Sequence, residues 1–467
     1  MTVVLDGDSL TLAELVRVAR AGEQVALSPA AYEAMAKART VVDRVVREEE
    51  EAYGLTTGVG VHKRARVRAP GHDRLLVEQH LIAQGPHAPA DVVRAMAVRL
   101  ANSFARGTTA ARPVLAEALI ERLNADTLPP VRILGSVGQS DLSSMADLAR
   151  GLLDDLEPAR GEAIALLNQS SFATGWGALA FTDAVSLLDA LDVAGALDLE
   201  AFGAAPAAFD PALGVARPYP GLQATLQRIG GLLEGSERLP RNLQDPLVFR
   251  TLPQLHGAAR DAFGFVAGQL AIELNTAQSN PLITADGRVL SVGAFEILPL
   301  ATALDLARLA LGPVLSSAAE RAVKLLQAPL TGLAEGLGMR PNLAESALSE
   351  LGIAIQAFAA EARLLAQPVS LELVSTWQAE GIEDRMTMAP LAARRLAEMV
   401  ELGARVASVE LCIAAQACDL RGDTLGAGTA RAHAAVRSII PFVGEGDPLP
   451  DLEPLVVLIG SGGLTGE

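Results

Sequence analysis

The sequence predicts an all-α protein, and three observations support this fold class. Apolar residues recur at i, i+3 and i+4 along most of the 467-residue chain, which is the spacing of a helix face. Ala, Leu, Glu and Arg, which are strong helix formers, dominate these stretches. Aromatic residues make up only 3% of the chain, which is too few for a sandwich or a barrel of strands.

The periodicity predicts an N-terminal helical region, residues 1–195. Helices are expected at 10–19 and from Pro29 onwards, with Ser9 and Ser28 as N-caps and Pro29 at the favoured first helical position. Further helices are expected at 75–84, 90–106, 112–124, 143–156 and 170–195.

Longer helices are predicted in the second region, residues 196–467, near 253–275, 296–326, 343–366 and 389–420. Helices longer than about 20 residues that are apolar on more than one side are typical of a central bundle. Such a bundle also buries surface against other subunits, so we expect an oligomer.

Composition and charge narrow the class of protein. The formal net charge of −17 disfavours nucleic-acid binding, because phosphates repel an acidic chain. Cys412 and Cys418 build neither a disulfide framework nor a CxxC metal site, and the N-terminus lacks the pattern of a signal peptide. No uninterrupted run of about 18 apolar residues occurs, so we expect no membrane-spanning helix and a cytoplasmic protein.

Common catalytic motifs are missing from the sequence. It contains no GxxxxGK[ST] phosphate loop, no HExxH zinc motif among its six histidines, and no GxSxG nucleophile motif. Gly58-Val59-Gly60 is not followed by the strand and helix of a dinucleotide site. We therefore expect neither a metal nor a nucleotide cofactor.

Polar residues interrupt several apolar stretches. These interruptions are Asn168-Gln169-Ser170-Ser171, Gln244-Asp245-Pro246 with Arg250, Asn275, Asn280-Pro281, Gln367-Pro368 and Glu383-Asp384-Arg385. Each one alone is typical of a helix cap or a turn. Because buried polar groups need partners, several of them can instead converge on one polar cavity between helices.

In this order, the segments resemble the histidine and aromatic amino-acid ammonia-lyase family. The family's YGxNTGFG motif is similar to Tyr53-Gly54-Leu55-Thr56-Thr57-Gly58-Val59-Gly60, its NSLxxG motif to Asn102-Ser103-Phe104-Ala105-Arg106-Gly107, and its LLNGT motif to Leu166-Leu167-Asn168. Its QDPYSxR motif is similar to Gln244-Asp245-Pro246-Leu247-Val248-Phe249-Arg250, its DNPL motif to Asn280-Pro281-Leu282, and its QED motif to Glu383-Asp384. The resemblance covers essentially the whole chain. It implies the ammonia-lyase fold and a homotetramer whose active sites combine several subunits.

The chain departs from this family at its electrophile. These lyases form a methylidene-imidazolone (MIO) ring from Ala-Ser-Gly within GSVGASGDLAPLA. Here Gly138 is followed by Gln139-Ser140-Asp141, one residue short and without the glycine. Ring closure needs a tight bend in which a glycine nitrogen attacks a carbonyl two residues back, so we expect no MIO ring. Gln139, Ser140 and Asp141 then either keep a structural role in the loop or have gained a catalytic one.

Other pocket positions differ as well. The family's GNFH reads Gly293-Ala294-Phe295-Glu296 here, Gln169 follows Asn168, and Leu247 replaces a tyrosine. A decayed, non-catalytic pseudoenzyme is one interpretation. Against it, six residues that match the family's substrate-handling positions are retained: Tyr53, His80, Asn168, Gln244, Arg250 and Glu383.

The resemblance gives these residues roles. Tyr53 is the catalytic base, although a tyrosine with a pKa near its usual value of about 10 needs nearby cations or donors to act at neutral pH. The basic segment 62–68 either supplies such cations or is a solvated loop. Arg250 offers a planar fork of donors for a substrate carboxylate, or else forms an ion pair with a nearby acid such as Asp245. His80 and Glu383 indicate a polar, imidazole-like substrate.

Loss of the electrophile changes the expected reaction. Ammonia is a poor leaving group and the β-proton of an amino acid is barely acidic, so without MIO the substrate itself must be activated. Ergothioneine, from which MIO-free relatives of this family eliminate trimethylamine, meets this condition, and Glu296 would lie near the cationic leaving group. We therefore expect an MIO-independent lyase acting on a small-molecule carboxylate. A biosynthetic isomerase, cyclase or conjugate-addition enzyme is the alternative.

Overall fold

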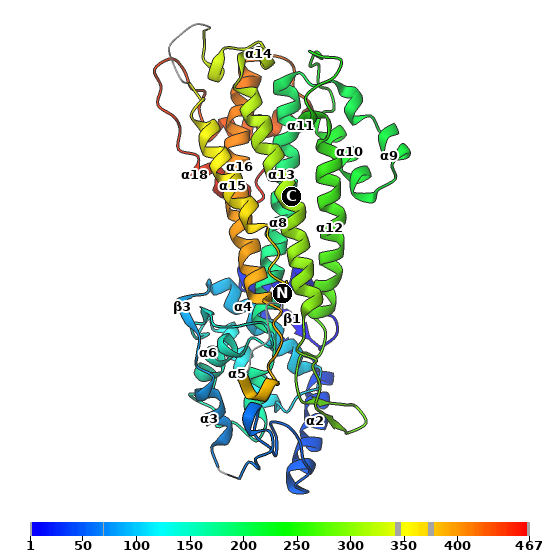
Figure 1. Cartoon of the computed structure of the whole chain (residues 1–467), viewed down its shortest axis with the longest axis vertical. Coiled ribbons are helices and arrows are strands. Elements are labelled where there is room, and N and C mark those ends of the chain that lie inside the picture. Colours follow the sequence, from blue (N-terminus) through cyan, green and yellow to red (C-terminus); the bar gives the residue numbers. More distant parts are fainter. Residues whose placement is uncertain (1, 69, 341–346, 372–377, 465–467) are drawn as a thin grey trace. The chain divides into compact units, whose positions relative to one another are not determined.

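The computed structural model describes residues 2–68, 70–340, 347–371 and 378–464, and helices make up most of it (Figure 1). The all-α fold class is confirmed. The long helices are α8 (Ser171–Phe202), α12 (Leu252–Glu273), α13 (Leu298–Leu325) and α16 (Ala389–Arg421). Each begins or ends within a few residues of the prediction, except that α8 continues to Phe202.

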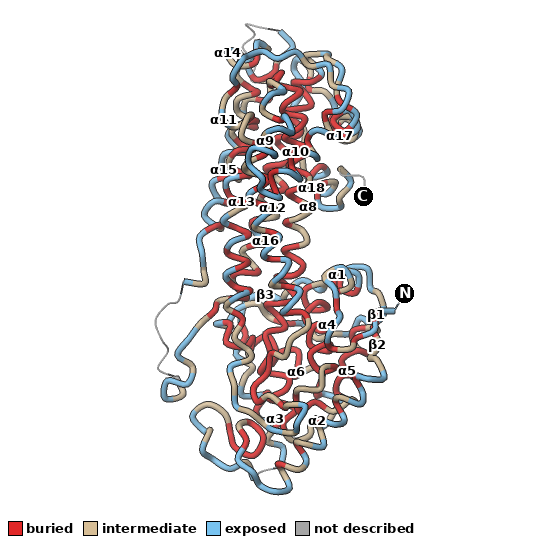
Figure 2. The backbone as a smooth tube through the Cα atoms, turned by 90° about the vertical axis from the view of Figure 1, so that its right-hand side faces the viewer, coloured by how far each residue is buried: buried red, intermediate tan, exposed pale blue. Residues whose placement is uncertain are grey.

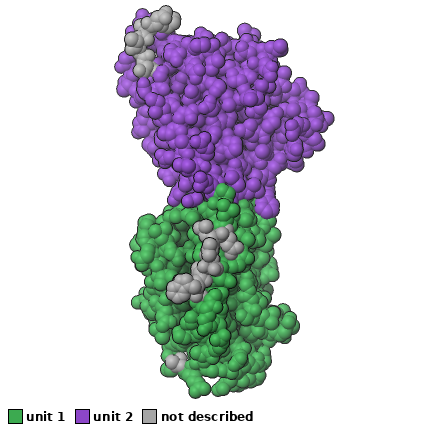
Figure 3. Space-filling view, in the orientation of Figure 1, with its two compact units in different colours: residues 1–180, 266–304, 368–394 green, residues 181–265, 305–367, 395–467 purple. Residues whose placement is uncertain are grey.

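The chain folds into two compact units, each assembled from three segments (Figure 3). Unit 1 contains residues 1–180, 266–304 and 368–394, and unit 2 contains residues 181–265, 305–367 and 395–467. This division differs from a linear one at residue 195, because later segments of the chain return to unit 1.

Unit 1 contains most of the shorter elements. They are β1 (Thr2–Leu5), α1 (Leu12–Ala21), β2 (Gln24–Leu27), α2 (Pro29–Arg47), η1 (Gly60–His62), α3 (His72–Gln79), β3 (Gln84–His87), α4 (Ala90–Ala105), α5 (Pro113–Asn124), β4 (Arg132–Leu134), α6 (Leu142–Leu152), α7 (Glu162–Leu167), β5 (Leu282–Ile283), β6 (Val289–Leu290) and η4 (Gln378–Gly381). The strands form three two-stranded pairs, of which β1 with β2 is parallel and the other two are antiparallel.

Unit 2 packs its shorter elements around the long helices. They are η2 (Pro206–Phe209), α9 (Ala212–Ala216), α10 (Pro220–Leu232), α11 (Leu247–Arg250), α14 (Ala328–Thr331), η3 (Glu335–Leu337), α15 (Leu351–Leu365), α17 (Ala427–Arg437) and α18 (Glu453–Gly460). In its core, Arg321 of α13 pairs with Asp198 of α8 at 2.9 Å and with Glu410 of α16 at 2.6 Å. Burial and the nearby Glu410 carboxylate raise the pKa of Asp198 well above its usual value.

Several predicted helix ends are wrong. The first helix is capped by Thr11, which forms a capping box with Glu14, while the Ser9 hydroxyl donates to Asp6. Ser28 is confirmed as the cap of α2, since it accepts a hydrogen bond from Ala31 N at 3.1 Å. The helix predicted at 75–84 ends at Gln79, because the chain then forms β3. The helix predicted at 343–366 is α15, which begins at Leu351, and residues 343–346 lie outside the described part.

Buried residues lie along α8, α13 and α16, and they also make up most of α4, α6 and α7 (red in Figure 2). Within the described residues, α13 is long and apolar enough to cross a membrane by length and composition, with a mean hydropathy of 1.4 over its most apolar window. However, 61% of that window is buried inside the protein, as in the core helix of a helical bundle.

Candidate active site

The Gln139-Ser140-Asp141 loop, where the resemblance places the MIO electrophile, is tied to distant parts of unit 1. Ser140 has a left-handed backbone with a φ of 56°, and its hydroxyl donates a hydrogen bond to Asn168 Oδ1. Asn168 Nδ2 donates in turn to the carbonyl of Asn280 at 2.8 Å. All three side chains are at least nine-tenths buried, so the loop conformation is fixed by partners within the protein.

Asp141 anchors the same loop to the start of α8. Its backbone N–H donates to the carbonyl of Gln169 at 2.8 Å, and its carboxyl group accepts from Ala173 N at 2.7 Å. Complete burial raises the pKa of Asp141 to about 7, although the hydrogen bonds from Ala173, Ser136 and Phe172 favour the ionised form. Asp141 thus accepts a hydrogen bond at the N-terminus of α8, which is consistent with the interpretation that it has a structural role in the loop.

Glu296 lies directly against this loop. Gln139 Nε2 donates to Glu296 Oε2 at 2.8 Å, and the two residues also form an isolated antiparallel bridge. The other oxygen, Oε1, accepts from Leu298 N at the start of α13 at 3.0 Å. Both oxygens therefore accept hydrogen bonds, which holds the carboxylate in one orientation.

Tyr53 lies on the glycine-rich loop that precedes η1, and its side chain is half-buried. Its hydroxyl oxygen accepts a hydrogen bond from Gly60 N at 3.0 Å. Burial raises the pKa of Tyr53, the Gly60 N–H acts in the opposite direction, and the negative charge of Glu383 raises the pKa further. Tyr53 is therefore a neutral phenol at neutral pH.

The basic segment 62–68 does not supply the cation that was considered for Tyr53. Lys63 Nζ pairs with Glu380 at 2.6 Å, and Arg66 pairs with Glu51 at 3.3 Å. The side chain of Arg64 is 81% exposed. These contacts favour the interpretation of the segment as a solvated loop, with Lys63 as its one well-packed cation.

His80 and Glu383 interact electrostatically near Tyr53. His80 follows α3, and its ring Nδ1 lies 2.7 Å from the carbonyl of Leu76. Because a carbonyl can only accept, Nδ1 is protonated and donates this hydrogen bond. Nε2 is then the nitrogen available to a ligand. Burial raises the pKa of Glu383, and the nearby His80 acts to lower it.

Gln244 and Arg250 meet in unit 2. With its amide oxygen facing Arg250, Gln244 accepts from both terminal guanidinium nitrogens, at 2.8 and 3.1 Å. The two side chains line a cavity of about 460 Å³. Arg250 Nε is buried and has no hydrogen-bond partner among the described residues, which is unusual for a guanidinium.

The alternative interpretation of Arg250, an ion pair with Asp245, is wrong. Asp245 accepts instead from Ala205 N at 2.7 Å and from Asn242 Nδ2 at 3.1 Å. Within the described part of the chain, no carboxylate pairs with Arg250. The guanidinium therefore keeps its charge available for an anionic ligand.

The structure thus groups the predicted site residues by unit. One group in unit 1 joins Tyr53, His80 and Glu383, and a second group in the same unit joins the loop of Gln139, Ser140 and Asp141 to Asn168 and Glu296. Gln244 and Arg250 belong to unit 2. The predicted convergence of polar segments is therefore found for Asn168 and Asn280. Asn275 instead accepts hydrogen bonds from Asn102 Nδ2 and from Leu10 N.

Thr387 contributes to the site without having been predicted, and Asn280 was predicted only as one of the polar groups that could converge. Thr387 Oγ1 donates to the carbonyl of Gly138 at 2.7 Å, and Asn280 Oδ1 accepts from Val292 N at 2.9 Å. Asn280 had been noted as a polar interruption without a role, whereas Thr387 carried no signal in the sequence. Among the described residues, no group of His, Cys, Asp and Glu side chains is arranged to hold a metal ion.

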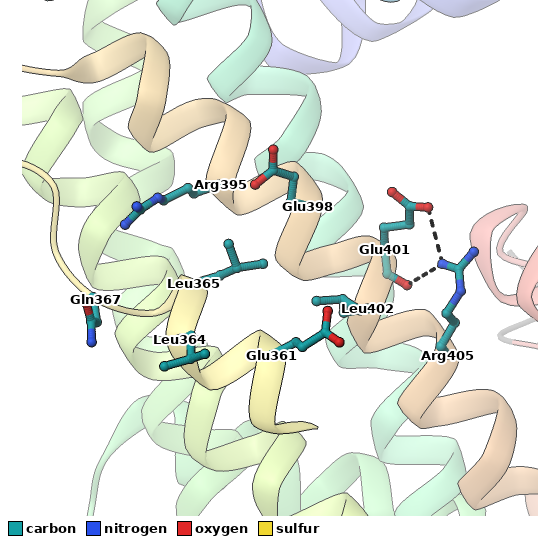
Figure 4. A pocket seen from close by; sticks show the side chains of 9 residues that line it. All are labelled: Glu361, Leu364, Leu365, Gln367, Arg395, Glu398, Glu401, Leu402 and Arg405. Carbon is teal, nitrogen blue, oxygen red and sulfur yellow. Dashed lines mark hydrogen bonds and ion pairs between the residues drawn. The ribbon is translucent and has the colours of Figure 1, made fainter. Parts of the chain in front are cut away.

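A separate cavity of about 610 Å³ lies between α15 and α16 in unit 2 (Figure 4). Glu361, Glu398, Glu401 and Arg405 are among its lining residues, and Arg405 pairs with Glu401 at 3.3 Å. Of the polar interruptions expected to converge, Gln367 lines this cavity, but none of the residues with a predicted catalytic or substrate-binding role does. It therefore adds nothing to the candidate active site.

The sequence is similar to known proteins over most of its length. The sequence matches the aromatic amino acid lyase family over residues 10–155 and 148–438. A histidine ammonia-lyase from Clostridium tetani is 33% identical over 475 aligned residues, which cover 94% of this chain and 92% of that protein.

Solved structures extend the similarity to other activities. The ergothioneine-degrading enzyme ergothionase from Treponema denticola has a TM-score of 0.93 and 25% identity, with 100% of both chains covered. Tyrosine aminomutase from Streptomyces globisporus has a TM-score of 0.91 and 26% identity, with 100% of this chain and 98% of that chain covered. The family match, which covers most of the chain, and the similarity to ergothionase support an amine-eliminating lyase function. The chain belongs to the aromatic amino acid lyase family.

Proposed function

We propose that this protein is an MIO-independent lyase that eliminates an amine from an activated amino acid or betaine. The observation that carries the proposal is the loop of Gln139, Ser140 and Asp141. MIO closure requires the nitrogen after the serine to attack a carbonyl two residues back, and in this chain that nitrogen belongs to Asp141. It donates instead to the carbonyl of Gln169, and the Asp141 side chain is held at the start of α8. These residues do not fit the ring.

Without the ring, the leaving group must be activated by the substrate itself. A quaternary ammonium leaves as a neutral amine and takes the electron pair of the breaking C–N bond, so it needs no covalent activation. A conjugated or thiol-bearing ring on the neighbouring carbon makes the C–H bond more acidic. Ergothioneine has both features, and the similarity to an ergothionase supports this class of substrate.

In the proposed reaction, Tyr53 removes the proton from the carbon next to the ring. The electrons of that C–H bond form the new C=C bond as the amine leaves. Because burial raises the pKa of Tyr53, the phenol must lose its proton before it can act as the base. A bound cation and the Gly60 N–H both favour the phenolate, so a cationic substrate would help to prepare its own base.

Arg250 is proposed to bind the substrate carboxylate. Its guanidinium has a neutral partner in Gln244 and an unpartnered Nε, so it can accept an anion without breaking an ion pair. Gln244 would then fix the plane of the guanidinium. Because Arg250 lies in unit 2, the proposal leaves open which chain of an oligomer supplies it to a given site.

Glu296 and His80 are proposed to recognise the two ends of the substrate. Glu296 accepts hydrogen bonds from Gln139 and Leu298 N on its two oxygens, which suits a fixed anion beside a quaternary ammonium rather than a proton carrier. His80 offers Nε2 as an acceptor for a ring N–H, because its Nδ1 proton is committed to Leu76. Together they favour a cationic substrate with an imidazole-like ring.

An isomerase is the second candidate, and the similarity to a tyrosine aminomutase favours it. The same base and carboxylate site would serve if the released amine were added back to the neighbouring carbon. An isomerase would yield a rearranged amino acid in place of an alkene and a free amine.

We also propose that the active form is a homotetramer. Large apolar side chains of α15 remain exposed in the single chain, with Ile353 at 69% and Leu364 at 63%, and such surfaces are typical of subunit contacts. Light scattering on the purified protein tests this, and a monomer would contradict it. The cytoplasmic location stays a prediction.

Proton NMR in D₂O tests the proposed reaction. The purified protein is incubated separately with histidine, phenylalanine, tyrosine and ergothioneine. A new pair of olefinic signals with free trimethylamine from ergothioneine alone is the expected result. Ammonia release from histidine would contradict MIO independence, and a rearranged amino acid without free amine would favour the isomerase. If no compound changes, the lyase proposal fails for this panel.

A further inference from the structure

An ion pair joins the segments that carry Tyr53 and Glu383. Lys63 follows η1, and its Nζ lies 2.6 Å from Glu380 Oε2 in η4. The Lys63 side chain is 20% exposed and that of Glu380 is 58% exposed, so the pair is shielded from solvent on the lysine side only. Glu380 lies three residues before Glu383, and Gly60 lies three residues before Lys63.

From this we propose that the Lys63–Glu380 pair is a positioning contact, which holds the Tyr53 hydroxyl and the Glu383 carboxylate in one arrangement for the reaction. This inference rests on the proposed function of Tyr53 and Glu383. Neither Lys63 nor Glu380 touches the reacting atoms. Their role is to fix the two segments that do.

The backbone of η4 supports this role. Ala379 and Glu380 have φ values of 50° and 58°, so two consecutive residues that are not glycine adopt the left-handed conformation. This conformation is uncommon for such residues and persists where surrounding contacts impose it. η1 packs against η4, and Gly60 faces Ala379 so closely that a Cβ added to Gly60 would meet the Ala379 Cβ at 3.6 Å.

The other end of the Glu383 segment is also held. Met388 N donates to the carbonyl of Val137 at 3.0 Å, and Thr387 Oγ1 donates to the carbonyl of Gly138 at 2.7 Å. These bonds tie the segment to the Gln139-Ser140-Asp141 loop. The Lys63–Glu380 pair completes the arrangement by tying its beginning to the tyrosine loop, where Gly60 N donates to the Tyr53 hydroxyl.

Arg64 provides a matched control for Lys63. It is the neighbouring residue, carries the same charge, and contacts the same Glu380 oxygen at 3.5 Å. However, its side chain is 81% exposed, so its interaction is screened by solvent. A positioning role for Lys63 therefore predicts different effects from the same substitution at residues 63 and 64.

Hydrogen–deuterium exchange tests the contact without any substrate. The full-length protein is compared with its Lys63→Met, Glu380→Gln and Arg64→Met variants, and exchange is followed in a peptide covering residues 54–66. We expect about two- to fivefold faster exchange in Lys63→Met and Glu380→Gln, the range that loss of a partly exposed ion pair allows. Arg64→Met should match the wild type. Unchanged exchange in Lys63→Met would overturn the proposal.

Turnover of ergothioneine provides the second measurement. In Lys63→Met we expect kcat to fall by about tenfold with KM nearly unchanged, because a displaced base affects the reaction more than binding. The double variant Lys63→Glu with Glu380→Lys restores the pair and should recover most of kcat. Faster exchange with unchanged kcat would overturn the positioning role. If the wild type is inactive, the proposed function fails, whereas the exchange experiment still decides whether the contact holds the loop.

Discussion

The Ser140 hydroxyl donates to the amide oxygen of Asn168, which lies 28 residues further along the chain. The contact lies in the loop where the sequence resemblance places the MIO electrophile. Since Asn168 also donates to the carbonyl of Asn280, the serine orients a buried amide. In the structure the Ser140 hydroxyl is therefore a structural donor.

The first prediction compares two substitutions of Ser140. Ser140→Ala leaves the buried Asn168 oxygen without its donor, which should cost about 1–3 kcal/mol in the free energy of unfolding. Ser140→Gly loses the same hydrogen bond but relieves the left-handed backbone, a gain of about 1 kcal/mol. Urea unfolding should therefore rank the wild type first, Ser140→Gly second and Ser140→Ala last. Equal stability of the two variants would mean that the backbone of residue 140 is not strained.

The second prediction concerns Tyr53. Tyr53→Phe removes the proposed base and should lower the rate of amine release by about 10²–10⁴-fold, while calorimetry shows little change in substrate binding. In the wild type, kcat should rise towards alkaline pH, because burial raises the pKa of the phenol and the phenolate is the active form. Unchanged turnover in Tyr53→Phe would remove Tyr53 from the mechanism.

The third prediction follows from Asp141. Its pKa of about 7 in the folded protein exceeds the usual 3.8, so the folded state binds this proton more tightly than the unfolded state. The resulting stability is complete below pH 3.8 and is lost as the pH rises towards 7. Asp141→Asn has no such proton, and its amide oxygen can still accept from Ala173 N.

The stability advantage of Asp141→Asn over the wild type should therefore grow by about 2–3 kcal/mol between pH 5 and pH 7. Unfolding curves of both proteins across this range measure the difference, in which the titration of all other groups cancels. Parallel pH profiles would mean that Asp141 is ionised throughout the range.

The fourth prediction concerns Arg250. Arg250→Lys loses the planar fork and should raise KM for a carboxylate substrate by about 10- to 100-fold. Stability should fall by no more than about 1.5 kcal/mol, because the lysine loses one of the two hydrogen bonds to Gln244 but leaves no acid unpaired. Arg217→Lys is the control, since Arg217 is an exposed residue of the same unit that contacts Tyr219. A KM unchanged in Arg250→Lys would show that the carboxylate binds elsewhere.

Most of the helical fold was readable from the sequence, because long helices repeat their apolar pattern over many turns. The short parallel pair of β1 and β2 was not, since each strand has four residues and its partner lies across α1. The cap of α1 was placed at Ser9 instead of Thr11, because two hydroxyl residues lie close to the same helix start.

The candidate site was predicted as a set of residues but not as a set of contacts. Tyr53, Asn168 and Arg250 could be named because each lies in a motif of its own. The bond between Gln139 and Glu296 joins residues 157 positions apart, and no local pattern encodes such a pairing. Thr387 was missed for the same reason, because its hydrogen bond to the Gly138 carbonyl exists only in the folded chain.

The discontinuous composition of unit 1 has a consequence for synthesis on the ribosome. Its last segment, residues 368–394, is translated after most of unit 2. At about 5–20 residues per second, the first 180 residues must wait on the order of 10–40 seconds for this segment to emerge. During that time the nascent N-terminal region exposes the apolar surface that residues 368–394 later cover. Chaperone binding during translation should therefore be strongest before Arg394 leaves the exit tunnel.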